Sequence, residues 1–136
     1  MRIKTKLAIA AAAAFASTAA FAGLQQPFPV DVDLAGQFAA GDMGAAQSAK
    51  DSTTFIGCGI RKVSTGVDTA FVNGFCQAAD ADGEQFTCFT TNPELLDAIS
   101  SISDFSFITF AWNVDGECTR IGNSTQSFYL TKNQTK

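Results

Sequence analysis

The chain has 136 residues and a formal net charge of −4, and it contains no histidine. The length predicts one domain. The lack of histidine excludes Ser-His-Asp and Cys-His nucleophilic sites and histidine-bound metals, and an acidic chain with scattered lysines and arginines argues against binding to nucleic acid or to anionic membranes.

Residues 1–22 have the pattern of an export leader. Three basic residues precede an alanine-rich apolar run, and Ala20-Phe21-Ala22 fits a cleavage site. We expect cleavage after Ala22 and a periplasmic or extracellular protein that is no longer attached to a membrane; an uncleaved anchor is the alternative. The remaining chain has six basic residues against all 13 acidic ones, a net charge of −7.

Four cysteines follow the leader, namely Cys58, Cys76, Cys88 and Cys118. An even number of cysteines in a small exported chain predicts two disulfides, whereas a metal site would need closer spacing or histidine. We therefore expect no cofactor and no metal ion. With the thiols bonded, catalysis would depend on carboxylates, lysines or Tyr129.

Residues 23–52 differ in composition from the rest of the chain. They lack cysteine and have few large apolar residues, so we expect a flexible N-terminal extension. A strand-like alternation runs through Phe28, Val30, Val32 and Leu34. It favours an alternative in which the extension pairs with the edge of another subunit or partner. Residues 41–50 have the composition of a short helix, weakened by two glycines.

A compact domain is predicted over 53–131, followed by a polar tail over 132–136. Residues 53–63, 69–79 and 84–90 have the pattern of strands, and turn residues separate them. With the first loop centred on Val67, Cys58 lies opposite Cys76, within reach of a cross-strand disulfide.

The second turn determines to which face of the sheet the side chains of Cys76 and Cys88 point. If Asp82-Gly83 are its two central residues, Cys76 lies opposite Phe89 and Gln77 lies opposite Cys88. Cys76 and Cys88 then point to opposite faces, which argues against a bond between them. We predict Cys58–Cys76 and Cys88–Cys118, one of the three connectivities that four cysteines allow.

A helix is predicted over 92–102. Asn92 is a good N-cap, Pro93 suits the first helical position and Glu94 suits the positive end of the helix dipole. One apolar stripe follows, made of Leu95, Leu96, Ile99 and Ile102.

Residues 103–121 are predicted to form a hairpin at the centre of the fold. Asp115-Gly116 is a strong signal for a two-residue turn, which places Asn113 opposite Cys118, Trp112 opposite Thr119 and Phe110 opposite Ile121. The predicted core face alternates along the first strand at Ile108, Phe110, Trp112 and Val114. Residues 126–131 are predicted to form a last short strand.

These elements predict a disulfide-stapled α+β fold that is mostly β. We expect a five- or six-stranded antiparallel barrel or sheet with one helix. The order of three strands, a helix and two strands is that of an OB-type barrel.

Several acidic residues are candidates for a metal or catalytic site. Asp80, Asp82 and Glu84 surround Gly83, but the calcium-loop pattern fails at Ala78 and Phe89, so a hairpin turn is favoured. Two acidic pairs could in principle serve glycoside hydrolysis, namely Asp115 with Glu117 and Glu94 with Asp97. No catalytic residue is predicted.

The residues expected to meet a ligand or partner lie elsewhere. Phe105, Phe107 and Arg120 lie on the face opposite the predicted core, and the alternating N-terminal residues Phe28, Val30 and Val32 are the second group.

From Phe55 to Lys132 the chain resembles a group of small exported bacterial proteins with four cysteines and no assigned function. The shared residues are Phe55-Ile56-Gly57-Cys58, Cys76 with Ala78 and Asp80, Cys88, Asn92-Pro93, Ala98-Ile99, Ser106-Phe107-Ile108, Phe110 and Gly116-Glu117-Cys118-Thr119. The resemblance implies export and a disulfide-bonded fold, and it implies no activity or ligand.

Together these features predict a non-catalytic extracytoplasmic module that binds an unknown protein or small ligand. A structural subunit that forms homo-oligomers through residues 23–52 is one alternative, and a hydrolase that uses carboxylates is another.

Overall fold

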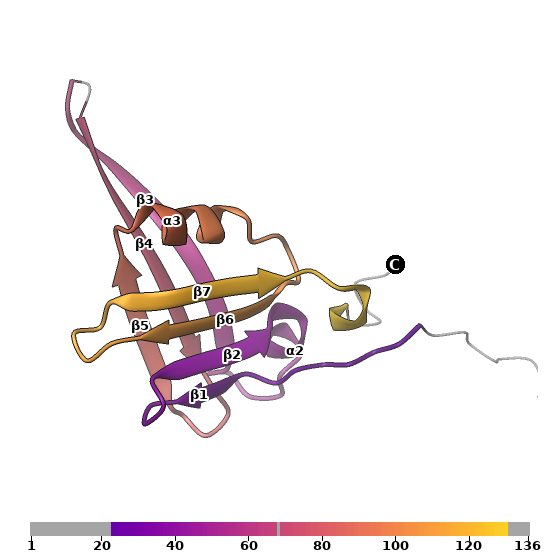
Figure 1. Cartoon of the computed structure of the whole chain (residues 1–136). Coiled ribbons are helices and arrows are strands. Elements are labelled where there is room, and N and C mark those ends of the chain that lie inside the picture. Colours follow the sequence, from indigo (N-terminus) through magenta and orange to yellow (C-terminus); the bar gives the residue numbers. More distant parts are fainter. Residues whose placement is uncertain (1–22, 68, 131–136) are drawn as a thin grey trace, which may run out of the picture.

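The computed structural model describes residues 23–67 and 69–130 (Figure 1). The predicted leader, residues 1–22, and the predicted polar tail, residues 132–136, lie outside the described residues. Two antiparallel sheets pack together. The first has the order β1 (Asp31–Asp33), β2 (Phe38–Asp42), β6 (Phe107–Trp112) and β7 (Cys118–Ser124). The second has the order β3 (Phe55–Gly66), β4 (Thr69–Ala79) and β5 (Gln85–Thr90).

Three short helical segments complete the described part. They are α2 (Met43–Gln47), α3 (Pro93–Ser100) and the 3-10 helix η2 (Ser127–Tyr129). The mostly-β class and the order of three strands, a helix and two strands are confirmed over 55–124. The described residues form seven strands instead of five or six, however, and these strands make two sheets that do not close into a barrel.

The core lies between the two sheets. Ile108, Phe110 and Trp112 are buried on one face of β6, as predicted. Phe86 of β5 stacks on the Trp112 ring, with centroids 4.2 Å apart. Val114 does not continue this face, because it lies in the turn after β6 and is 88 % exposed.

The N-terminal segment belongs to this core, which corrects the expected flexible extension and the domain boundary at residue 53. β2 lies between β1 and β6 in the sheet. Val32 is 2 % exposed and Ala39 is fully buried. The alternation detected in the sequence therefore serves the chain's own sheet, and Val30 and Val32 are core residues. The short helix expected within 41–50 is confirmed as α2, whose N-cap is Asp42.

Both predicted disulfides are confirmed. Cys58 lies opposite Cys76, as expected. Cys76 lies directly opposite Cys88, not Phe89, so both cysteines point into the core. The expected opposite orientation was wrong, although the pairing inferred from it is correct. Cys88–Cys118 joins β5 of one sheet to β7 of the other.

One turn motif occurs twice and explains the register of both the β4–β5 and the β6–β7 hairpins. Asp80-Ala81-Asp82-Gly83-Glu84 and Asn113-Val114-Asp115-Gly116-Glu117 share a pattern in which the first side chain accepts hydrogen bonds from two backbone N–H groups, two and four residues later. Each loop has three residues and ends in a glycine with positive φ, Gly83 at 88° and Gly116 at 78°. Such loops close with a glycine bulge. Trp112 therefore lies opposite Cys118, not Thr119, while Phe110 lies opposite Ile121 as predicted.

The glycine at the end of the second loop gives a testable prediction. Gly116→Ala is expected to lower the free energy of unfolding by about 1 kcal/mol, because an L-residue is strained at positive φ. A Cβ atom at Gly116 would meet nothing within 4 Å, so no clash contributes. Gly57→Ala is the control, since its Cβ would also meet open space and its φ is ordinary. Urea unfolding of both variants measures the difference; equal losses would contradict the assignment.

The helix prediction is confirmed at its start and shortened at its end. Asn92 accepts a hydrogen bond from the Glu94 N–H at 2.9 Å, and Ile99 is buried. The predicted last strand is instead η2. The adjacent Phe128 and Tyr129 rings contact each other at 4.6 Å, and Tyr129 stacks on Phe107. A strand would send two neighbouring side chains to opposite faces, so these contacts favour the 3-10 turn.

Candidate binding groove along strand β3

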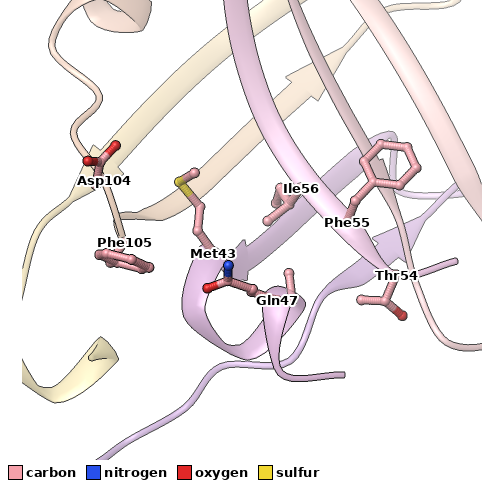
Figure 2. A pocket seen from close by; sticks show the side chains of 8 residues that line it. Met43, Gln47, Thr54, Phe55, Ile56, Asp104 and Phe105 are labelled. Carbon is pink, nitrogen blue, oxygen red and sulfur yellow. The ribbon is translucent and has the colours of Figure 1, made fainter. Parts of the chain in front are cut away.

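A hollow of about 300 Å³ lies between α2, the start of β3 and the loop before β6 (Figure 2). Its lining is Met43, Ala46, Gln47, Thr54, Phe55, Ile56, Asp104 and Phe105. Figure 2 shows Met43 in the centre of this group, with Phe105 on one side and Ile56 on the other, while the Phe55 ring points away. The lining is mostly apolar, and its one ionised side chain is that of Asp104.

Two further hollows continue the first one along β3. The second, of about 350 Å³, shares Met43 and Asp104 with the first and extends to Ile60. The third, of about 340 Å³, shares Ile60 and Ser100 with the second and extends to Lys62. We call this row the β3 groove. One side is β3, and the other is formed by α2, residues 102–105 and α3.

The β3 groove follows an unpaired strand edge. Within residues 23–67 and 69–130, β4 is the only sheet neighbour of β3. The Cα atoms of Cys58 and Cys76 are 4.0 Å apart, the spacing of a pair whose backbone groups do not bond to each other. The hydrogen bond from the Asp80 N–H to the Glu84 carbonyl leads to the same result. It shows that Asp80, and therefore every second residue of β4 including Cys76, directs its backbone groups toward β5 and not toward β3. The backbone N–H and C=O groups of alternate β3 residues therefore point away from β4, at Ile56, Cys58, Ile60 and Lys62.

The opposite wall is held in place by its own hydrogen bonds. Ser106 is fully buried, and its hydroxyl bonds to the Ser103 carbonyl at 2.8 Å and to the Thr125 hydroxyl at 3.0 Å. The Met43 N–H bonds to the Ser106 carbonyl, which ties α2 to this loop. Between these anchors Phe105 has a φ of 62°, a strained value that the surrounding bonds maintain. Phe105 is therefore presented to the groove by a fixed loop.

The beginning of β3 is anchored by Asp51. The backbone N–H of Thr54, and then that of Thr53, donate to its carboxylate and hold the pKa of Asp51 well below its usual range. The Thr54 and Thr53 hydroxyls donate to the same carboxylate. Asp51 is fully exposed to solvent. Its carboxylate stabilises the turn that precedes β3 through these hydrogen bonds.

The structure separates the six residues predicted to meet a partner. Phe105 lines the groove. Phe107 packs against Phe28 at 5.1 Å, away from the groove lining, and Arg120 lies over the Phe38 ring at 5.3 Å. Val30 and Val32 are in the core.

Sequence reasoning missed most of the groove. Met43 falls within the predicted extension, and Ile56 and Ile60 are predicted only as residues of a strand. One sequence signal could have located the groove. The predicted first strand of the disulfide-bonded domain has no charged residue and no proline between Phe55 and Ile60.

The acidic residues weighed as sites have local structural contacts. Asp80 is 6 % exposed and accepts from the Asp82, Glu84 and Val32 N–H groups, so the hairpin-turn interpretation is confirmed. The Glu117 carboxylate accepts from the Asn113 side-chain amide at 2.9 Å. Over residues 23–67 and 69–130, no group of three or more Asp, Glu or Cys side chains is placed to hold a metal ion.

No helix within the described residues is long and apolar enough to cross a membrane. Comparison of the chain with protein-family models, with curated proteins and with solved structures found no match. The function is therefore inferred from the geometry of the chain itself.

Proposed function

We propose that this protein is an exported, non-catalytic binding module and that the β3 groove is its recognition site. The observation that carries the proposal is the row of three hollows between β3 and a wall of α2, α3 and a hydrogen-bonded loop. Binding sites are typically concave and mostly apolar, with a few polar groups that orient the ligand. The leader pattern and the two disulfides support an oxidising, extracytoplasmic compartment.

The alternatives receive less support from the described residues. Self-association through residues 23–52 was suggested by the alternation of Phe28, Val30 and Val32, but both valines are buried in the chain's own core. A hydrolase needs two carboxylates that converge in a cleft. Asp104 and Asp97 line different hollows.

Methionine methyl NMR tests the proposed site, because Met43 is the single methionine outside the predicted leader. N-acetyl-leucine methylamide, a small neutral apolar probe, is expected to shift the Met43 methyl resonance in a saturable way. Phe105→Ala should weaken this binding about tenfold, the equivalent of about 1.4 kcal/mol, because it removes one wall of the first hollow.

Phe71→Ala is the matched control for that substitution. Phe71 is an equally large aromatic residue on β4, 52 % exposed and outside the groove lining. Its loss should leave the Met43 response unchanged. A Met43 methyl that does not move up to the solubility limit of the probe, or equal effects of the two variants, would contradict the proposal.

A further inference from the structure

The backbone of β3 indicates what kind of ligand fits the groove. We propose that the groove accepts an extended polypeptide segment of another protein, which adds to β3 as a fourth strand of its sheet; this inference rests on the proposed binding function. Figure 1 shows β3 as the long outer strand of the β3–β4 hairpin, whose tip extends beyond α3. An unpaired edge of this kind is a template for an added strand.

The first support is the row of backbone groups of β3 that point away from β4. Four alternate residues, from Ile56 to Lys62, direct N–H and C=O groups away from β4. Among the described residues, none of the backbone hydrogen bonds outside the ladders engages β3. An added strand of about eight residues would satisfy these groups, since a strand rises about 3.3 Å per residue over the span from Phe55 to Lys62. Small apolar molecules cannot do this.

The second support is that the first half of β3 carries neither of the two residue types, proline and charged residues, that usually block an edge strand. Natural edge strands are blocked by proline, by charge or by a covering element. Residues 55–60 contain neither proline nor charge. Arg61 and Lys62 are the two charged residues of β3, and they lie where the hairpin reaches its exposed end. The hollows leave space beside the unprotected stretch.

The side chains of the groove specify the chemistry of the added strand. The first hollow, around Met43 and Ile56, fits an apolar side chain. Asp104 borders both the first and the second hollow and is exposed. A basic side chain of the ligand would complement it, and the net charge of −7 after the predicted cleavage favours a basic ligand over the whole surface. The expected ligand therefore alternates apolar and basic residues.

A second copy of this chain fits less well than a free segment. Each copy carries α2 and α3 against its own β3, and both line the groove. Edge-to-edge pairing of two copies would bring these helical walls together on the same face of the joined sheet. An extended segment carries no such walls, so it can enter between β3 and the helices.

A random octapeptide phage library, selected on the purified oxidised protein, supplies the probes. Alternating apolar and basic octapeptides are expected to be enriched. The best peptide, made synthetically with a fluorescent label, should bind at least tenfold less well to Lys62→Pro than to Lys62→Ala. Proline removes an outward N–H and is tolerated at an edge, whereas alanine removes only the charge. Thermal unfolding should show that both variants remain folded.

Amide hydrogen exchange gives a second, independent readout. In the free protein, slow exchange is expected where the N–H bonds to β4, at Gly57, Gly59 and Arg61. Fast exchange is expected where the N–H points to the groove, at Ile56, Cys58 and Ile60. Bound peptide should slow the second set and leave the first set unchanged. A ligand that occupies only the hollows would not produce this alternation.

The outcomes separate the two proposals. If the Met43 methyl responds to the neutral probe but peptides do not distinguish the two Lys62 variants, strand addition is wrong and the groove remains a binding site. If the Met43 methyl does not respond and the enriched peptides bind Phe105→Ala as well as the unaltered protein, both proposals fail. Enrichment of no peptide overturns the inference. Slow exchange at Ile56 and Cys58 that depends on protein concentration, without peptide, would indicate a second copy and overturn it as well.

Discussion

Replacing Asp80 with alanine is expected to lower the free energy of unfolding by about 3 kcal/mol, because a buried acceptor of several hydrogen bonds is lost. Asp80 is 6 % exposed. One carboxylate oxygen accepts from the Asp82 N–H at 3.0 Å and from the Glu84 N–H at 2.9 Å, and the other accepts from the Val32 N–H at 3.2 Å. Asp80→Ala would therefore loosen both the β4–β5 turn and the attachment of β1.

The second copy of the turn motif provides the matched control. Asn113 makes the same two hydrogen bonds within its own loop, to the Asp115 and Glu117 N–H groups, but it holds no distant strand. Asn113→Ala is expected to cost about 1 kcal/mol, since the freed N–H groups can bond to water. Urea unfolding at neutral pH measures both changes. Equal losses would show that the bond to Val32 contributes nothing.

Removal of the Cys88–Cys118 disulfide is the second large effect that we expect. The double substitution of both cysteines with alanine should destabilise the fold by about 4 kcal/mol, because a disulfide that closes a loop of this size restricts the unfolded chain. The two cysteines are 30 residues apart in sequence, and they join the two sheets. Cys88 is fully buried and Cys118 is 6 % exposed, so the substitutions also leave unfilled core volume.

The other disulfide tests whether the link between sheets matters. Cys58 and Cys76 are 18 residues apart and lie on adjacent strands. Loop entropy alone predicts about 3 kcal/mol for this bond, close to the value for the longer loop. We expect the Cys88–Cys118 variant to lose more stability and to become sensitive to proteases within β6 and β7. Identical losses and identical cleavage patterns would refute the special role of the bond between sheets.

Features that depend on short stretches of sequence were predictable. The Asn92 cap and the apolar stripe place α3, and alternation along Ile108, Phe110 and Trp112 identifies the central strand. The cysteine pairing was also correct, although one argument for it was not. For α3 and the central strand the information lies within a few neighbouring residues, because helix caps and strand periodicity are local properties.

At both hairpin turns the predicted strand register differs from the observed one by one residue. Asp-Gly suggested two-residue loops at both hairpins. In each case an Asx side chain two residues before Asp binds the loop from within, which favours a three-residue loop with glycine at the left-handed position. The shared pattern, Asx-X-Asp-Gly-Glu, was visible twice in the sequence and could have corrected both registers.

The N-terminal strands and the groove could not be predicted in the same way. β2 is rich in alanine and glycine, so composition suggested a flexible segment, but Ala39 and Ala40 are buried in the sheet and a Cβ atom at Gly41 would lie 2.8 Å from the Cα of Val30. The groove combines α2, β3, α3 and residues 102–105. None of these segments marks a site alone, and only Phe105 was identified beforehand.

The position of β2 has a consequence for the biosynthesis of the protein. Phe38 pairs with Ala111 and Asp42 with Phe107, so β2, which is synthesised early, can form its hydrogen bonds to β6 only after residue 107 and those that follow have been made. In a nascent chain that ends before residue 107, β1 and β2 can pair only with each other, and their apolar side chains lack the cover of β6. Folding should therefore be post-translational and slow, as is typical when distant segments must meet, and a chaperone that shields residues 30–42 should raise the yield.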